Sequence, residues 1–496
     1  MLFPELSTSI LPKDSWLHRI LWSFLGLGIL LVVAQYVYNR NLWIDEAGLA
    51  LSIIRRSFDQ LTQPLDYDHV APVGFLMATR LSVAFFGKGE MALRLFPLLC
   101  YLTAIPSFFF LLNRFKLNKT LVLVTVATFC LSLSLIRYAT EMKQYSSDVL
   151  VGILIVYATL RLALQRAKNL VLYALIGTVA IWFSNISIIM LAVCGLYVAF
   201  KQGYLLKQWQ VAIPFIAWLF SFCIYYFYFI HGHPAKKLML DYWEDAFMPT
   251  NPFSMKFWGF VLTSLKGIYS WMLGFGPFWF FPFLLSCAGT WFLLRSKHYL
   301  LLYFIFAPIV CHLSLSALKL YPFSERLILY LAPSFILLYC IGAWFLTEIL
   351  MARFNAMPKV MLLTPVLLCF IPLAKRYPIQ REEIKECLQF MQENSQKKET
   401  IYVYYSANMA YLYYTETTFF NFDNGIVFGK MYRENPALYI KEISSIKGKI
   451  WLLFSHVYPF DTKENEEKYI LTHLPNTKTL KKHTSRGSSV YLVERY

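Results

Sequence analysis

Two adjacent carboxylates, Asp45 and Glu46, follow the first long apolar run of the chain. A carboxylate held where a membrane helix reaches water can act as a general base on an incoming hydroxyl or amine. The same pair would also suit the start of a helix, with Asp45 as an N-cap and Glu46 complementing the helix dipole. The local sequence favours the cap and leaves the chemical role open.

The residues after this pair indicate the element that would position it. Ala47, Leu51, Ile54 and Phe58 recur at helical spacing, while the charged side chains between them point elsewhere. We therefore predict an amphipathic helix that lies on the membrane surface, with both acids in or just before its first turn.

The composition is that of a polytopic α-helical membrane protein. Of 496 residues, 58% are hydrophobic and only 15% are charged, too few to cover a soluble chain of this length. Repeated apolar runs have the length that a bilayer requires of helices. We predict about eleven spans, at roughly 17–38, 90–112, 120–136, 146–164, 169–184, 186–200, 211–230, 276–294, 299–317, 327–346 and 358–374.

Charge predicts the orientation. The net charge of +17 does not indicate nucleic-acid binding, because the basic residues gather in short connections and in the C-terminal tail, where they fit anionic lipid. Basic, acid-poor connections mark the cytoplasmic side, so the N-terminus is predicted inside and the C-terminus outside. Most acids before residue 375 then fall on the outer face, which favours a site there. The connections concerned contain Arg114, Lys116, Lys119, Arg161, Arg166, Lys168, Lys201, Lys207, Arg295, Lys297, Arg353 and Lys359.

The chain divides into two predicted domains. Residues 1–374 form the transmembrane domain, with long outer loops at about 39–89 and 231–275 that roof a cavity. Residues 375–496 have an ordinary soluble composition and predict a small α/β domain outside the membrane. Its expected strands are at 400–405, 449–455 and 489–494, and its expected helices are at 381–394, 409–414 and 464–471.

No metal or cofactor site is indicated. The nine cysteines include no CxxC pair, and eight of them lie within apolar runs. Asp68 and His69 are neighbours without a third spaced ligand, so loop polarity explains them better than a metal. His231 and His233 are interpreted in the same way.

A polar group is predicted where the third and fourth spans meet. On a helix, Glu141, Tyr145 and Asp148 would share one face. Asp148 lies about a turn inside the membrane, where a charge costs about 2.5 to 3.5 kcal/mol and usually faces a cavity. Arg137 or Lys143 would then be available to a phosphate. An interfacial ladder of snorkelling charges is the alternative.

Two further arginines have comparable alternatives. Arg326 precedes the tenth span, where a guanidinium can bind phosphate oxygens bidentately or anchor the helix at the interface. Arg94 stands four residues after Glu90 at a helix entrance, a spacing typical of a structural ion pair.

Several of these stretches, in this order, resemble motifs of the GT-C glycosyltransferases of the protein O-mannosyltransferase and aminoarabinose (lipid A) transferase type, over nearly the whole chain. Lys143 replaces the family's usual arginine, and Ala71 interrupts its double proline. The matching stretches are Trp43-Ile44-Asp45-Glu46, His69-Val70-Ala71-Pro72-Val73, the segment Gly87 to Arg94 with its Gly-x-x-Glu-x-x-x-Arg pattern, Glu141-Met142-Lys143-Gln144-Tyr145, and Glu325-Arg326.

The resemblance implies an inverting transfer of a sugar from a polyprenyl phosphate on the non-cytoplasmic side of a bacterial inner membrane. It implies Asp45 as the base, with Glu46 supporting the loop or substrate. Arg326, with Lys143 or Arg137, would hold the departing phosphate, and Asp68, His69, Glu141, Tyr145, Asp148 and Arg94 would line the substrate cavity. The donor is a substrate rather than a cofactor, a divalent metal is not indicated, and the acceptor is a glycan, lipid or protein.

Two other functions remain open at this point. An O-antigen polymerase or ligase would be expected to use an arginine-rich long outer loop. A transporter or flippase for a lipid-linked saccharide would favour charges near the bilayer midplane and symmetric halves. Polar residues gathered at one face favour chemistry there.

Overall fold

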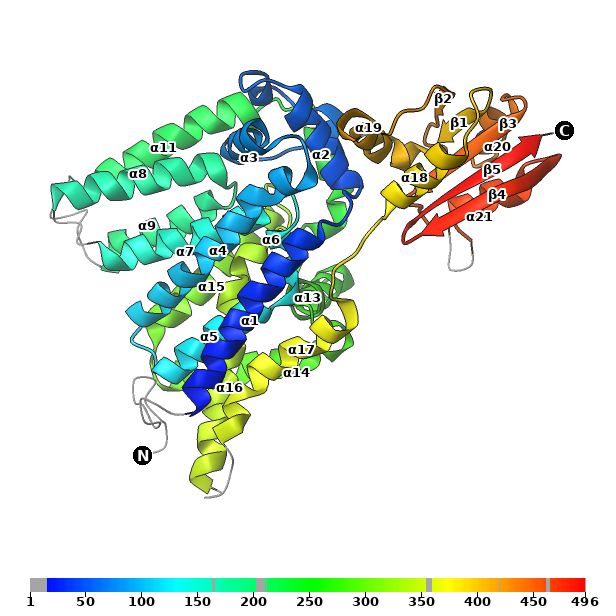
Figure 1. The fold of residues 1–496 in the computed structure, drawn as a ribbon. Helices are drawn as coiled ribbons and strands as arrows, with labels where there is room; N and C mark the ends of the chain where they lie inside the picture. Colours follow the sequence, from blue (N-terminus) through cyan, green and yellow to red (C-terminus); the bar gives the residue numbers. More distant parts are fainter. Residues whose placement is uncertain are drawn as a thin grey trace.

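The computed structural model describes residues 16–162, 166–201, 210, 212–353, 359–418, 420–460 and 464–495. A bundle of long helices forms one part, and a smaller domain built around a sheet forms the other (Figure 1). The short helices α2 (Ile44–Arg55) and α3 (Val73–Phe86) lie at the end of the bundle that faces the sheet domain.

The helices of the bundle follow the apolar runs of the sequence closely. A break at Ser132 divides the predicted third span into two helices that meet at 56°. The bundle contains α1 (Trp16–Tyr38), α4 (Glu90–Arg114), α5 (Lys119–Leu131), α6 (Leu133–Ala139), α7 (Tyr145–Arg161), α8 (Ala167–Phe183), α9 (Ser187–Lys201), α11 (Ala212–Tyr225) continued by η4 (Tyr226–Ile230), α14 (Phe280–Arg295), α15 (Tyr299–Ala317), α16 (Ala332–Arg353) and α17 (Thr364–Arg376).

The protein is an integral membrane protein, although the predicted count of eleven spans is not confirmed. Among the described residues, six helices are long and apolar enough to cross a membrane, or seven if α5 and α6 form one broken span. Three apolar helices, α3, α8 and α9, are shorter. Parts of the predicted spans at 146–164, 211–230 and 358–374 and the predicted cytoplasmic Lys207 lie outside the described residues.

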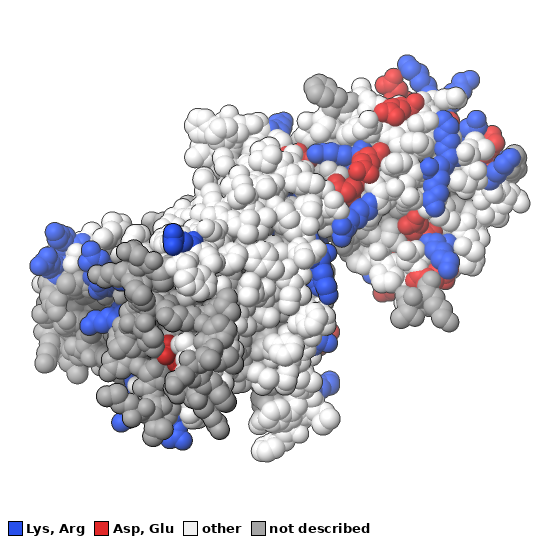
Figure 2. Space-filling model, turned by 60° about the horizontal axis from the view of Figure 1, so that its bottom comes forward, with Lys and Arg blue, Asp and Glu red and all other residues white. Residues whose placement is uncertain are grey.

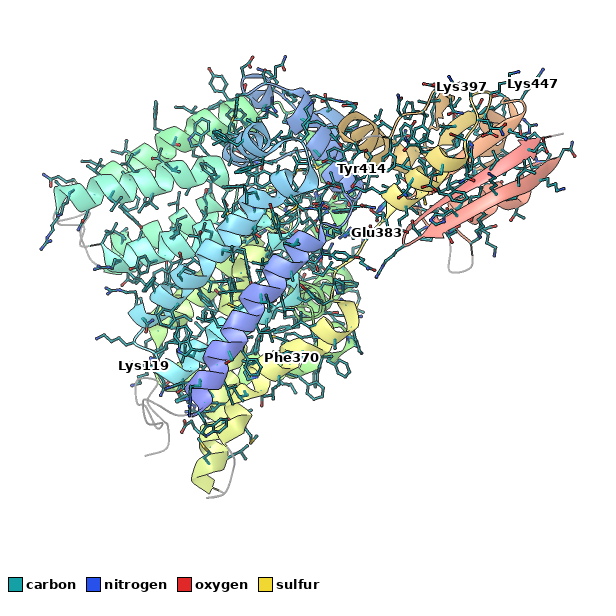
Figure 3. All side chains as sticks on the ribbon, viewed as in Figure 1. Lys119, Phe370, Glu383, Lys397, Tyr414 and Lys447 are labelled. Atoms are coloured by element: carbon teal, nitrogen blue, oxygen red, sulfur yellow. The ribbon has the colours of Figure 1, made fainter. Side chains whose placement is uncertain are left out.

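Charged side chains are unevenly distributed over the surface. In Figure 2 they gather on the sheet domain and at the opposite end of the bundle, while the surface between carries few. Lys119 lies at the end of the bundle far from the sheet domain, whereas Tyr414 and Glu383 lie at the junction (Figure 3). This separation agrees with a bilayer around the middle of the bundle.

Glycines allow two of the long helices to pack closely. A Cβ atom at Gly342 of α16 would stand 1.8 Å from the carbonyl oxygen of Leu285 in α14, and one at Gly289 would stand 2.3 Å from the carbonyl oxygen of Leu338. Small residues of this kind let the backbones of membrane helices approach one another. α14 and α16 therefore pack closely along one side of the bundle.

The outer loop between α11 and α14 is mostly helical. It consists of α12 (Lys236–Tyr242), η5 (Glu244–Ala246), α13 (Met255–Gly267), η6 (Ile268–Met272) and η7 (Gly276–Phe278). The backbone N–H of Phe323 donates to the carbonyl of Ala246 at 2.8 Å, which ties this loop to the segment before α16.

The C-terminal part is an α/β domain with a mixed five-stranded sheet in the order β2-β1-β3-β5-β4. β1 is parallel to β2 and β3, and β5 is antiparallel to β3 and β4. Three strands and three helices lie near their predicted positions; β2, β4 and α20 were not predicted. The elements are α18 (Ile384–Asn394), β1 (Thr400–Val403), α19 (Asn408–Thr417), β2 (Gly425–Phe428), α20 (Ala437–Ser444), β3 (Lys449–Ser455), α21 (Glu466–His473), β4 (Thr477–Ser485) and β5 (Ser488–Arg495).

The prediction of a surface-lying amphipathic helix after Asp45 is wrong. Every residue of α2 from Glu46 to Ile54 is buried, because α3 covers one side and α19 of the C-terminal domain covers another. One apolar core joins α2 and α3 to α18, α19 and the sheet. Since this core crosses the junction, the first outer loop and the C-terminal domain pack against each other. The domain boundary at residue 375 remains a prediction from composition.

Candidate active site

Asp45 and Arg326 form an ion pair at the end of the bundle that faces the sheet domain, which we call the outer end (Figure 1). Arg326 Nη1 lies 3.0 Å from Asp45 Oδ2, and both side chains are part-exposed, at 23% and 29%. The guanidinium also donates to the Tyr242 hydroxyl at 3.3 Å and lies 4.7 Å from the ring centroid of Trp243. A carboxylate at the start of the first outer loop thus meets a cation supplied 281 residues later, and both remain accessible.

Asp45 is the second residue of α2 and is not its cap. Trp43 holds the N-cap position without a side-chain hydrogen bond to the helix. The cap interpretation of Asp45 is therefore wrong, and its carboxylate is free to face the site. The position still places an acid in the first turn, where the positive end of the helix dipole stabilises negative charge.

Three cationic or polar side chains surround the Asp45 carboxylate. Burial alone would raise the pKa of Asp45, but Lys143, Arg326 and His69 outweigh it and hold the pKa below its ordinary value. Asp45 is consequently ionised throughout the neutral range. The lowered pKa makes this carboxylate a weaker base, and a reduction of the surrounding positive charge would strengthen it.

Lys143 is the second cation of this site. Its side chain is half-buried and has no ion-pair partner within 4.0 Å among the described residues. Burial lowers the pKa of Lys143, and Asp45 and Glu141 oppose that effect. A part-desolvated lysine beside an arginine is a favourable place for an anion with several oxygens.

His69 closes the other side of Asp45. Burial lowers the pKa of His69 to about 4, so that its ring is neutral at neutral pH. The ring packs on Gly48 of α2, where a Cβ atom would stand 2.3 Å from Nε2 and 2.6 Å from Sδ of Met409 in the C-terminal domain. Any side chain at position 48 would displace the histidine, the methionine or both.

Glu46 lies directly beneath the site and is completely enclosed. Its Oε1 accepts from Arg94 Nε at 2.9 Å and from the Met142 N–H at 2.8 Å, and its Oε2 accepts from Arg94 Nη2 at 2.8 Å and Arg40 Nη1 at 3.0 Å. A carboxylate has about four acceptor positions, and all are occupied. Glu46 therefore positions α2 and leaves no acceptor for a substrate.

A second buried carboxylate extends this network. Glu141 Oε2 accepts from Arg40 Nη2 and from Arg137 Nε, each at 3.3 Å. Arg94 also donates to the carbonyl of Arg40 at 2.6 Å. Three arginines and two glutamates thus lock the turn before α2 to the turn before α7, and paired charges of this kind are costly to disrupt singly.

Comparison with known proteins identifies the fold. No protein-family model and no curated protein sequence matches the chain. Among solved structures, ArnT from Cupriavidus metallidurans bound to undecaprenyl phosphate is similar over 96% of this chain and 98% of that one, with a TM-score of 0.53 and 11% identity. The chain has the GT-C glycosyltransferase fold.

Further structures share the likeness to different extents. ArnT from the same organism in the apo state has a TM-score of 0.51 at 11% identity and covers 97% of this chain and 98% of that one. The Archaeoglobus fulgidus oligosaccharyltransferase in the apo form is 12% identical over 89% of this chain and 70% of that one, with a TM-score of 0.45.

Within the GT-C fold, the predicted site residues form an accessible group and a buried one. Asp45, Arg326, Lys143 and His69 lie together at the outer end of the bundle. Arg137, 30% exposed, lies at the edge of this group, with its guanidinium 5.2 Å from the ring centroid of Tyr138. The buried members are Glu46, Arg94 and Glu141.

The remaining predicted residues lie apart from this group or at its margin. Tyr145 is buried with its ring 5.0 Å from that of Tyr138. Asp148 is buried and accepts from the Ser184 hydroxyl at 2.5 Å, at the break between α8 and α9. Asp68 is exposed on its loop, with a positive φ of 56°.

Two predicted local arrangements are wrong. Glu141 does not share a helix face with Tyr145, because α7 begins only at Tyr145. Arg94 does not pair with Glu90 four residues earlier but with Glu46, while Glu90 pairs with Lys385 of the C-terminal domain. Tertiary partners outweigh the small gain of an i, i+4 pair on an isolated helix.

The sequence did not reveal several residues that support the site. Arg40 follows the first apolar run and resembles an ordinary boundary charge, yet it is buried and pairs with both Glu46 and Glu141. Tyr242 and Trp243 contact Arg326 from the second outer loop. Two adjacent aromatic residues in a long outer loop were the available signal.

A recess of about 120 Å³ lies beside the site. Its lining includes His69, Asn185, Tyr225, Tyr228 and His233, from the first outer loop, the α8–α9 break and the outer end of α11. His69 thus stands between the recess and Asp45. Among the described residues, no three His, Cys, Asp or Glu side chains are grouped so as to hold a metal ion.

Proposed function

We propose that this protein is a membrane glycosyltransferase that moves a sugar from a polyprenyl-phosphate donor to an acceptor on the non-cytoplasmic face, with inversion. The observation that carries the proposal is the accessible Asp45 carboxylate facing the two cations Arg326 and Lys143. A base and a phosphate-binding pair at one boundary of the bundle are the groups that this reaction needs. The fold shared with a structure bound to undecaprenyl phosphate supports the donor class.

In this mechanism the acceptor hydroxyl or amine attacks the anomeric carbon of the donor sugar. Asp45 takes the proton of the nucleophile as the new carbon–oxygen or carbon–nitrogen bond forms. The bond between the anomeric carbon and the phosphate oxygen breaks, and its electron pair stays on that oxygen. Free polyprenyl phosphate leaves, and its growing negative charge is stabilised by Arg326 and Lys143, with Arg137 at the edge of the site.

Donor binding also makes Asp45 a better base. Before binding, Arg326 pairs with Asp45 and keeps its pKa low. A donor phosphate that takes Arg326 and Lys143 removes part of this positive influence and adds a negative charge nearby. Both changes raise the pKa of Asp45 toward the range in which a general base is effective.

This sequence of events gives a pH prediction. Activity needs the ionised carboxylate, so the rate falls as pH drops through the pKa of Asp45. The acid limb of kcat/KM, which reports the free enzyme, is expected below the ordinary range of aspartate, because that pKa is lowered. The acid limb of kcat, which reports the donor complex, is expected at higher pH. Steady-state rates across the acid range, with coinciding limbs as the contrary result, test this order.

The function itself is tested with purified protein in lipid nanodiscs. Synthetic undecaprenyl phosphates that carry mannose, glucose, galactose or 4-amino-4-deoxyarabinose are supplied, and free undecaprenyl phosphate is measured by mass spectrometry. Release from at least one donor, dependent on Arg326, is expected. Release that persists unchanged in Arg326→Gln, or no release in the presence of an extract that supplies acceptors, would reject the proposal. We place this activity on the periplasmic side of a bacterial inner membrane.

A further inference from the structure

One buried tyrosine of the C-terminal domain contacts the segment that carries Asp45. The Tyr414 hydroxyl of α19 accepts from the backbone N–H of Leu42 at 2.7 Å and donates to Glu90 Oε1 at 3.1 Å. Lys385 of α18 pairs with the same Glu90 oxygen, and its Nζ lies 5.1 Å from the Tyr414 ring centroid. Two residues of the C-terminal domain thus hold two residues of the membrane domain in one network, at the junction where Figure 3 labels Tyr414.

The bond to Leu42 acts on the turn that leads into α2. In this turn the carbonyls of Arg40 and Asn41 accept from Arg94, so Arg94 holds one side of the turn and Tyr414 holds the other. Asp45 follows three residues after Leu42, within the first turn of α2. A shift of the Leu42 backbone is therefore passed directly to the Asp45 carboxylate.

The next residue, Trp43, is also held from the C-terminal side. The Arg381 guanidinium lies 3.7 Å from one of its ring centroids, and the ring of His456 lies 6.0 Å away. His456 in turn pairs with Glu382 at 2.9 Å. Leu42 and Trp43 are thus both held by residues of the C-terminal part of the chain, Leu42 by Tyr414 and Trp43 by Arg381 and His456.

The geometry points to Tyr414 as a positioning residue for the transfer reaction, through which the C-terminal domain fixes the place of Asp45 relative to the phosphate-binding cations. This inference rests on the proposed function. It assigns the C-terminal domain a part in the chemical step, because a misplacement of about 1 Å at a reacting group can lower a rate on the order of 10²-fold. Besides its pair with Asp45, Arg326 is held by Tyr242 and Trp243, which Tyr414 does not contact, so the donor KM is expected to change much less than kcat.

The neighbouring Tyr413 provides a matched control. It is also buried at the same interface, and its hydroxyl donates to the carbonyl of Lys88 at 2.7 Å. Tyr413→Phe and Tyr414→Phe each remove one hydroxyl from the contact between the two domains. Only the second removes a partner of the turn before Asp45.

The test compares the two variants in the donor assay and by hydrogen exchange. Tyr414→Phe is expected to lower kcat about tenfold or more with the donor KM within about twofold of wild type, and to speed amide exchange in peptides that contain Leu42. Tyr413→Phe is expected to retain wild-type kcat and exchange at Leu42. Equal loss of kcat in both variants, or loss through KM alone in Tyr414→Phe, would show that the interface serves only stability and would overturn the inference.

The exchange measurement separates this inference from the proposed function. If wild-type protein releases no lipid phosphate, the proposed function fails, whatever the exchange pattern. If wild type releases lipid phosphate and Tyr414→Phe exchanges faster at Leu42 with unchanged kcat, the proposed function stands and the positioning role is rejected.

Discussion

Asp45→Asn is expected to lower the release of polyprenyl phosphate from its sugar donor by about 10²- to 10⁴-fold, the usual contribution of a general base. The amide has nearly the same shape as the carboxylate but cannot take the proton of the nucleophile. It also removes the charge that pairs with Arg326, so donor phosphate binding should be retained or improved. Release of lipid phosphate, together with donor KM, measures both effects.

Asp59→Asn is the matched control for this substitution. Asp59 is an exposed carboxylate beyond the end of α2, and its contacts are local, including one from the Ser57 hydroxyl at 2.5 Å. Its neutralisation should leave turnover near that of wild type. A folded Asp45→Asn protein that releases lipid phosphate at the wild-type rate would remove Asp45 from the mechanism.

Glu46→Gln is expected to have the largest effect on stability, lowering the free energy of unfolding by about 3–5 kcal/mol. The substitution leaves Arg40 and Arg94 buried without their shared counter-charge and turns one acceptor oxygen into a donor group facing donors. Thermal unfolding followed with a thiol-reactive dye measures this loss, because six of the cysteines are buried in the folded protein.

Glu416→Gln gives the comparison for an ion pair in water. Glu416 of α19 pairs with Arg55 of α2, but both side chains are more than one-third exposed. An exposed pair contributes about 0–1 kcal/mol, so the transition should hardly move. If the unfolding temperature of Glu46→Gln is not lower than that of Glu416→Gln, the stabilising role assigned to the buried Glu46 network is wrong.

The positions of the membrane helices were predictable because the bilayer imposes one requirement on all of them. A segment such as Tyr299–Ala317 must form its backbone hydrogen bonds within the helix and present apolar side chains to lipid. Both requirements can be recognised from the local sequence alone. β3 was predicted at its observed limits for a related reason, since six of its seven residues are buried in the sheet. β4 escaped prediction because its side chains are mostly exposed and alternate too little to mark a strand.

The partners of the charged residues were less predictable. The types and outer-face location of Asp45 and Arg326 indicated chemistry, but nothing local specifies that these two meet. The i, i+4 spacing predicted an ion pair between Glu90 and Arg94. The actual partners of Glu90 are Lys385 and Tyr414, which lie about 300 residues later in the chain. Local periodicity likewise described α2 as half-buried, because the α19 surface that covers its other side is encoded in another part of the chain.

The burial of α2 between the bundle and the C-terminal domain has a consequence for biosynthesis. α2 is synthesised while most of the polypeptide is still untranslated, and the cover formed by α18 and α19 is synthesised only with the last quarter of the chain. Until then the apolar side chains of α2 need a temporary shelter, such as the translocation machinery or a chaperone. Nascent or prematurely terminated products would contain Asp45 without the scaffold that orients it, so under the proposed function they would not consume lipid carriers.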